Sequence, residues 1–322
     1  MIHVVNQPKL LEFEAQQFFN EQRLKLAPKL IKFVEDHPLF ASKEGTIEFM
    51  ETGVSSLVCR LEIDAKKYIL KSPLSYTNGG GEARFLREWK EAGVRVPTIF
   101  DDGMLDDEHT YLLMEYIEAP ILRSLTKHNV APPTIWLEIG GTLATMHTPV
   151  AEGFGRIING KAECTTFKDW LLGEGIAKRV QTIQELGLLG DEHGPIERVF
   201  EVLLTYASGQ TSSTLCHFDL TPNNIFATTP IAIFDPSPML NYGIIDIGRT
   251  ILSALFHGDV QAAKELEEGY FEGQADYDRR ALHVSVILNA YWRFVYQYKT
   301  NRMEEIKAVQ EYLAENRGLL DS

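Results

Sequence analysis

The chain has 322 residues, of which 44% are hydrophobic and 24% charged, and its formal net charge is −14. This composition is typical of a folded globular protein and excludes a disordered chain. The negative charge disfavours a nucleic acid as partner, and the lack of any apolar run of roughly 20 residues disfavours a membrane partner.

The N-terminus and the cysteines indicate where the protein is expected to work. Residues 1–10 contain no basic stretch followed by an apolar one, so we expect no secretory signal. Cys59, Cys164 and Cys216 are far apart and form no CxxC pair, which argues against a disulfide framework or a zinc site. We therefore expect a cytoplasmic protein.

The first forty residues have apolar side chains at helical spacing. Leu11, Ala15 and Phe18 recur in this way, and so do the apolar residues between Leu26 and Val34. Proline is favoured in the first turn of a helix, so Pro28 is expected to open the second of two helices.

From Gly45 the apolar residues recur at every second position, which predicts strands. The elements expected in order are strands 47–49, 57–64 and 67–71, a helix 82–92, and strands 96–100 and 110–116. Turns are expected at Gly53–Ser56 and at Asp101–Gly103, and Gly93 is expected to end the helix.

After Pro120 the pattern becomes mainly helical, with short β segments expected at 215–216 and within 224–234. The apolar and aromatic stretch 281–299 is expected to form core. We therefore expect an α+β fold in three parts. They are an N-terminal helical extension (1–44), a small mixed β/α lobe (45–117) and a larger, mainly helical lobe (118–322).

The segment His217–Asn224 has the form His-x-Asp-x-x-x-x-Asn. Phosphoryl transfer needs a positioned acceptor hydroxyl and neutralised phosphate charge. Asp219 could accept the proton of the acceptor, and the amide oxygen of Asn224 could bind a metal. Taken alone, however, Asp219 could simply form a turn before Pro222.

Asp235 follows eleven residues after Asn224, at the end of a stretch that is typical of a hairpin. A hairpin would return Asp235 to the side of Asn224, where both could bind one magnesium ion through oxygen. The alternative is an aspartate that only ends a strand before Pro236.

The segment His217–Ile225, followed by Ile233–Pro236, resembles the catalytic and metal-binding segments of the aminoglycoside phosphotransferase family. This superfamily includes choline, homoserine, macrolide and fructosamine kinases, and the resemblance implies a bilobal, protein-kinase-like fold. It also implies ATP and Mg²⁺ as cofactors, with Asp219 as the catalytic base and Asn224 and Asp235 as magnesium ligands.

Further segments match the family in the expected order. The resemblance implies that Ser55 and Ser56 belong to a hairpin loop that covers the nucleotide, and that Lys71 contacts its α- and β-phosphates. The lysine needs a carboxylate partner on the next helix, for which Glu82 matches best and Glu88 is the alternative.

The resemblance also covers Leu112–Ile117, where the main chain of Glu115 and Ile117 would hold the adenine. His217 is expected to brace the catalytic loop by hydrogen bonding to its backbone. Asp246, in a segment that also resembles the family, is a second candidate for the metal aspartate, but it lies too far from Asn224 for a tight hairpin, so we expect it to support the loop. Phe218 is a departure, because many members have glycine there.

We thus expect transfer of the γ-phosphoryl group of ATP to a hydroxyl of a small molecule. The alternatives are a non-catalytic, ATP-binding pseudokinase, and a metal-dependent hydrolase that uses His217, Asp219 and Asp235. The net charge would suit a cationic acceptor. Acidic residues that could line its pocket, or form a solvated helix face, are Glu265, Glu267, Glu268, Glu272 and Asp276.

Overall fold

The computed structural model describes residues 2–10, 17–51, 55–74, 81–127, 132, 134–158, 160–188, 196–274 and 277–321. Its contacts divide into two compact units. The first contains Met1–Arg87 and Val96–Ala119, and the second contains Glu88–Arg95 and Pro120–Ser322. Residues 1–44 thus lie within the first unit. The expected α+β class is confirmed, since each unit combines a sheet with helices.

The first unit contains a six-stranded sheet of order β1-β2-β3-β4-β6-β5, in which only the pair β1–β2 is parallel. Its strands are β1 Ile2–Val4, β2 Gly45–Phe49, β3 Ser56–Ile63, β4 Lys66–Pro73, β5 Ile99–Met104 and β6 Thr110–Glu115. The alternation in β3 buries Leu57, Cys59 and Leu61 on one face, as the period of two predicts.

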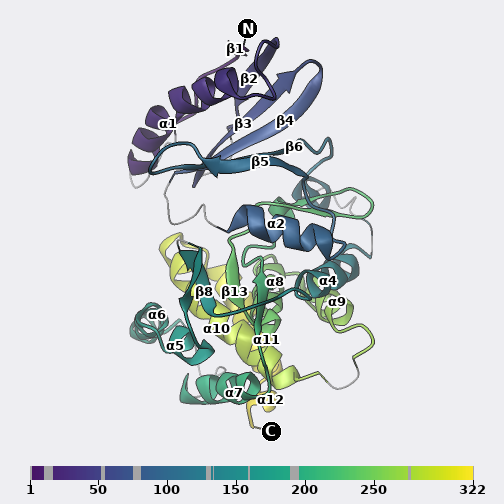
Figure 1. Ribbon diagram of the computed structural model, residues 1–322. Helices are drawn as coiled ribbons and strands as arrows, with labels where there is room; N and C mark the ends of the chain where they lie inside the picture. The colour runs from purple at the N-terminus through teal and green to yellow at the C-terminus, as the bar shows by residue number, and fades with distance from the viewer. Residues whose placement is uncertain are drawn as a thin grey trace. The chain divides into compact units, whose positions relative to one another are not determined.

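Helix α1 (Gln17–Asp36) packs on this sheet (Figure 1). Leu26, Leu30 and Val34 are fully buried in the same cluster as the strand residues. The expectation of two helices was wrong, because Pro28 lies inside α1 rather than at the start of a helix. The prediction at Leu11 and Ala15 lies outside the described residues.

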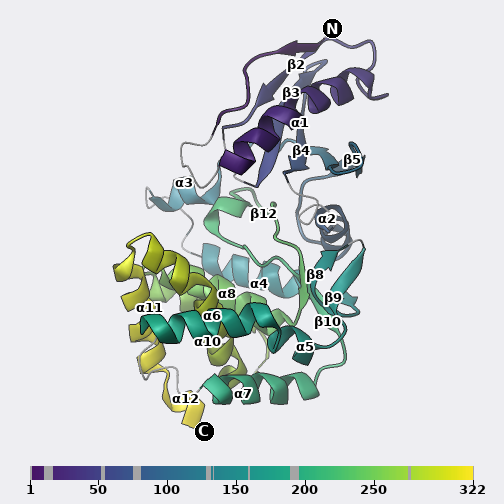
Figure 2. The same ribbon diagram turned by 90° about the vertical axis from the view of Figure 1, so that its left-hand side faces the viewer.

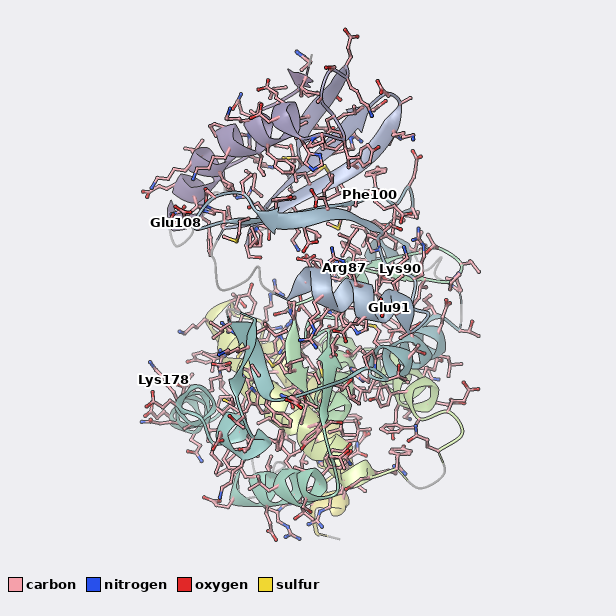
Figure 3. All side chains as sticks on the ribbon, in the orientation of Figure 1. Arg87, Lys90, Glu91, Phe100, Glu108 and Lys178 are labelled. Atoms are coloured by element: carbon pink, nitrogen blue, oxygen red, sulfur yellow. The ribbon has the colours of Figure 1, made fainter. Side chains whose placement is uncertain are left out.

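The turn expected at Asp101–Gly103 was also wrong. These residues continue β5, and the chain turns afterwards, where the N–H of Leu105 donates to the carbonyl of His109. The helix expected before it is confirmed as α2 (Glu82–Glu91), with Gly93 at a φ of +96° just beyond its end. The exposed residues of α2 are Arg84, Arg87, Lys90 and Glu91, and the last three are labelled in Figure 3.

The second unit contains a five-stranded sheet of order β7-β10-β13-β8-β9, of which only β10 was predicted. Its strands are β7 Val150–Ala151, β8 Phe154–Ile158, β9 Lys161–Cys164, β10 Ser213–Cys216 and β13 Met239–Asn241. Strands of two to five residues are too short to show a clear period. The predicted hairpin is confirmed as β11 (Ile225–Phe226) paired with β12 (Ala232–Ile233).

Helix α10 (Arg279–Lys299) lies among several helices of this unit (Figure 2). The expected core is confirmed between Ala281 and Phe294, whereas Tyr296 and Tyr298 are exposed. Helix α10 packs against α6, α7, α8, α11 and α12. The other helices are α3 Leu122–Lys127, α4 Ile135–Met146, α5 Phe167–Leu171, α6 Glu174–Leu186, α7 Ile196–Ser208, α8 Gly243–Leu255, α9 Val260–Tyr270, α11 Met303–Glu315 and α12 Gly318–Asp321. Among the helices in the described ranges, none combines the length and apolarity needed to cross a bilayer.

Candidate active site

His217 begins the loop that follows β10, and its side chain is fully buried. Its Nδ1 accepts a hydrogen bond from the backbone N–H of Asp219, at 3.3 Å. The ring proton therefore lies on Nε2, which donates to the carbonyl of Phe234 at 3.0 Å. Burial lowers the pKa of His217 and favours this neutral form. The imidazole, stacked on the Trp89 ring, thus links Asp219 to the strand end that carries Asp235.

Asp246, in the first turn of α8, fixes the same loop through its carboxylate. Its Oδ2 accepts the backbone N–H of His217 at 2.6 Å, and its Oδ1 accepts that of Phe218 at 2.9 Å. Its Oδ2 also lies 3.1 Å from Nε2 of His147. Burial acts to raise the pKa of Asp246, but the contact with His147 and the N–H donors outweigh it and hold the pKa below its usual value.

Phe218 has a φ of +58°, in the left-handed region that favours glycine. A bulky residue in this region costs on the order of 1–2 kcal/mol. The hydrogen bond to Asp246 and the burial of the ring hold Phe218 in place.

Asp219 comes next, and 43% of its side chain is exposed. The amide Nδ2 of Asn224 donates to its backbone carbonyl at 2.8 Å and to its Oδ2 at 3.2 Å. Thr221 turns the chain between them by accepting the N–H of Asn223. The loop is therefore held by the buried side chains of His217 and Asp246, whereas the carboxylate of Asp219 is exposed to solvent.

Asn224 and Asp235 lie at the two ends of the β11–β12 hairpin. The N–H of Phe234 donates to the carbonyl of Asn224 at 3.1 Å, so Asp235 follows the residue paired with Asn224. Because the amide nitrogen of Asn224 is used by Asp219, its amide oxygen is the atom that could bind a metal. The hairpin thus brings the two predicted oxygen ligands to neighbouring positions.

In the first unit, Lys71 on β4 pairs with Glu82 at the start of α2. Lys71 Nζ lies 2.6 Å from Glu82 Oε2, and each side chain is only 7% exposed. The pair borders a pocket of about 260 Å³. The structure therefore brings Lys71 together with the first of the two carboxylates considered from the sequence.

The remaining predicted nucleotide contacts also lie in the first unit. Ser55 is exposed, whereas Ser56 is buried at the start of β3; Gly53 lies outside the described residues. Glu115 ends β6, and its Oε2 accepts the N–H of Thr98. Ile117 is buried just after this strand. The adenine contacts of Glu115 and Ile117 stay a prediction.

Two residues near Asp219 were missed from the sequence. Arg293 on α10 places Nη1 4.0 Å from Asp219 Oδ1. Arg249 on α8 lies with its guanidinium 5.1 Å from the centre of the Phe218 ring. The only available signal was that Arg249 follows Asp246 by three residues, and so shares its side of a helix. No sequence pattern pointed to Arg293.

Comparisons with known proteins show the family and the fold of the chain. A model of the phosphotransferase enzyme family matches residues 46–283, although no curated protein matches the sequence. The crystal structure of the aminoglycoside phosphotransferase APH(4)-Ia is similar, with a TM-score of 0.56 at 14% identity, over 92% of this chain and 97% of that chain.

Two further structures are similar over most of their length. A thermostable mutant of APH(4)-Ia, in a ternary complex with ADP and hygromycin B, has a TM-score of 0.57 at 15% identity and covers 88% of this chain and 97% of its own. A candidate fructosamine-3-kinase from Thermobifida fusca YX-ER1 has a TM-score of 0.51 at 17% identity, over 83% of this chain and 94% of that chain. Because the family model matches well over half of the 322 residues and these structures share the fold, the chain belongs to the phosphotransferase enzyme family and has the α+β, protein-kinase-like fold of its small-molecule kinases.

Proposed function

We propose that the protein is an ATP- and magnesium-dependent phosphotransferase that moves the γ-phosphoryl group to a hydroxyl of a small molecule. The observation that carries this proposal is the exposed carboxylate of Asp219 on a loop with buried anchors. Its neighbours His217, Asn224 and Asp246 hold the backbone of the loop, so the carboxylate can meet an acceptor with little reorganisation.

In the proposed reaction Asp219 accepts the proton of the acceptor hydroxyl as the hydroxyl oxygen attacks the γ-phosphorus. The bond from this phosphorus to the β–γ bridging oxygen breaks, a bond to the acceptor oxygen forms, and ADP leaves. The proton then passes from Asp219 to solvent. The amide of Asn224 fixes the orientation of the carboxylate through the contact to Oδ2.

Lys71 is proposed to hold the α- and β-phosphates of ATP, with Glu82 orienting its ammonium group. Asn224 and Asp235 fit magnesium, because they offer an amide oxygen and a carboxylate at neighbouring positions. When bound, the ion would neutralise phosphate charge.

The small-molecule acceptor is supported by the family and by the related structures. A similar phosphotransferase is described in complex with ADP and hygromycin B, a nucleotide together with a small acceptor. Pseudokinase function is less favoured, since Lys71, Asp219, Asn224 and Asp235 all retain side chains suited to their roles.

The test compares Asp219→Ala and Asp219→Asn with the wild type, measuring ADP release with Mg-ATP and a panel of hydroxyl compounds, and with water alone. We expect turnover to fall by roughly 10²–10⁴-fold while ATP binding, measured by calorimetry, persists. The matched control is Asp107→Ala, which changes an exposed aspartate beyond β5. Normal turnover by Asp219→Ala would refute Asp219 as the catalytic base. A wild type that binds Mg-ATP without ever releasing ADP would favour the non-catalytic pseudokinase.

A further inference from the structure

Two arginines of the second unit converge on the catalytic loop from different helices. Arg293 of α10 has Nη1 at 4.0 Å from Oδ1 of Asp219. Arg249 of α8 lies over the Phe218 ring, one residue before Asp219, with 5.1 Å from guanidinium to ring centre. Helix α10 packs against α8 (Figure 2), and the two side chains approach consecutive residues of the loop, Phe218 and Asp219.

These arginines lack the partners that partly buried guanidinium groups normally have. Among the described residues, Arg249 makes no hydrogen bond and has no carboxylate within 4.0 Å. The Nε atoms of Arg249 and Arg293 are both buried, and neither has a hydrogen-bond partner among the described residues. Among the described residues, the carboxylate that lies within 4.0 Å of Arg293 is that of Asp219, which the proposed reaction uses as a base.

A third arginine, Arg179 of α6, adds positive charge. The Nη1 of Arg179 donates to the carbonyl of Trp292 on α10, at 3.5 Å. Burial and then the charge of Arg293 lower the pKa of Arg249 to about 10; Arg179 acts in the same direction, and Asp219 and Asp246 act against it. Positive charges from three helices therefore act on one another beside Asp219.

Two of the acidic residues considered earlier for a cationic acceptor have partners of their own. On α9, Glu265 accepts a hydrogen bond from Gln261, and Glu267 accepts one from the hydroxyl of Tyr277 and lies 3.6 Å from Nε of Arg279. Glu268 is exposed on the same helix, and Asp276 lies outside the described residues. No contact in the described part of the chain connects these carboxylates to Asp219.

We propose that Arg249 and Arg293, assisted by Arg179, bind an anionic group of the acceptor, so that the acceptor is a small hydroxyl compound carrying a carboxylate or a phosphate. Guanidinium groups suit this task because their planar N–H donors match both oxyanions. The ring of Trp292, edge-on to Phe218 and stacked on Trp170, adds an apolar wall beside them. The proposal rests on the proposed function, since it needs Asp219 as the base.

The test uses matched acceptors that differ in charge. Glycerate is compared with glyceramide, glycerol 3-phosphate with glycerol, and gluconate with glucose, and hygromycin B represents cationic acceptors. ADP release is measured at constant ionic strength for the wild type, Arg293→Met, Arg249→Met and Arg249→Lys. The control is Arg198→Met, which changes an arginine on α7 that pairs with Glu201.

We expect the wild type to prefer the anionic member of a pair. Comparing the carboxylate pairs with the phosphate pair shows which of the two anionic groups the site binds. Arg293→Met and Arg249→Met should each raise the KM for that acceptor roughly 10–100-fold and leave the KM for ATP unchanged. Arg249→Lys should retain part of the preference, and Arg198→Met all of it. Preference for neutral or cationic compounds, or a rise in the KM for ATP alone, would overturn the proposal.

If no compound of the panel is phosphorylated, sulfate binding in the presence of saturating Mg-AMP-PNP decides the matter. Calorimetry should detect one sulfate site in the wild type that is lost in the Arg249→Met/Arg293→Met double variant, and equal binding by both proteins would overturn the proposal. Hydrolysis of ATP by water, lost in Asp219→Ala, reports on the proposed function separately. Arg293 is the safer probe of the two, because its side chain is 30% exposed and its replacement should not prevent folding.

Discussion

The Oδ2 atom of Asp246 lies 2.6 Å from the backbone nitrogen of His217, so a residue of α8 fixes the first residue of the catalytic loop. The same carboxylate accepts the next N–H, that of Phe218, and meets the ring of His147. Hydrogen bonds to an ionised, buried acceptor are among the stronger ones in proteins. The position of Asp219, two residues along, therefore depends on a fully buried side chain of another element.

Replacement of Asp246 should therefore reduce both stability and turnover. In Asp246→Ala the N–H groups of His217 and Phe218 lose their acceptor, and each unsatisfied buried group costs about 1–3 kcal/mol. We expect kcat to fall roughly 10²-fold with little change in the KM for ATP, and Asp246→Asn to lie between this variant and the wild type. Urea unfolding and steady-state kinetics measure the two effects. The control Glu311→Ala, at an exposed site on α11, should behave as the wild type does.

Glu82→Gln should impair the binding of ATP by releasing Lys71. The two side chains form a buried pair at 2.6 Å, and removing one partner of a buried ion pair costs about 3–5 kcal/mol. We expect the KM for ATP to rise roughly 10-fold or more, whereas Glu91→Gln, at an exposed site on the same helix, leaves it unchanged. In a double-mutant cycle, the free energy of ATP binding lost by the double variant Lys71→Met/Glu82→Gln should be much smaller than the sum of the losses in the two single variants. Additive losses would mean that the two side chains do not act as a pair.

The features predicted correctly from the sequence depend on residues that are close together along the chain. The β11–β12 hairpin needs only the residues between Asn224 and Asp235, and its pairing was predictable from two short apolar runs around a turn. Helix α2 likewise carries its own signals, with Glu82 at its start and Gly93 after its end.

The features missed depend on contacts between distant segments. Arg293 reaches Asp219 only because α10 packs beside the catalytic loop, and no spacing in the sequence encodes that approach. Pro28 is tolerated inside α1, where packing of Leu26 and Leu30 against the sheet outweighs the lost hydrogen bond. Strand β5 runs through Asp101 because its pairing with β6 overrides the turn preference of the residues there.

Acidification should destabilise the protein through His283 of α10. The side chain is 2% exposed, and neither ring nitrogen has a hydrogen-bond partner among the described residues. Burial lowers the pKa of His283 to about 4, from 6.5 in its unperturbed state. Between these values the unfolded chain binds the proton and the folded chain does not, so stability is complete above about pH 6.5 and falls as the pH drops towards 4.

The loss attributable to His283 is at most about 3 kcal/mol, at 1.36 kcal/mol for each pKa unit. We expect the free energy of unfolding of His283→Leu to change less between pH 7.5 and pH 5 than that of the wild type. The control His3→Leu, at an exposed position on β1, should keep the slope of the wild type. Parallel slopes for all three proteins would show that His283 does not titrate in this range.

Gly140 and its neighbour Gly141 in α4 provide a matched pair of probes for the packing that supports the site. A Cβ at Gly140 would lie 2.8 Å from the backbone nitrogen of Tyr270 on α9, and closer still to the carbonyl oxygen of Leu266. A Cβ at Gly141 would meet only the carbonyl oxygen of Gly269, at an ordinary 3.7 Å. Alanine should therefore force the two helices apart at the first position and fit at the second.

Gly140→Ala is expected to lower the free energy of unfolding by about 1–3 kcal/mol. Gly141→Ala should instead raise it by up to about 1 kcal/mol, because alanine favours the helix and restricts the unfolded chain. Displacement of α9 would also move Tyr270, whose hydroxyl lies 2.8 Å from Nδ1 of His147, the residue that contacts Asp246. We therefore expect kcat to fall in Gly140→Ala and to stay unchanged in Gly141→Ala, as measured by urea unfolding and ADP release. Equal stability and turnover in the two variants would mean that the close approach of α4 and α9 does not position the catalytic loop.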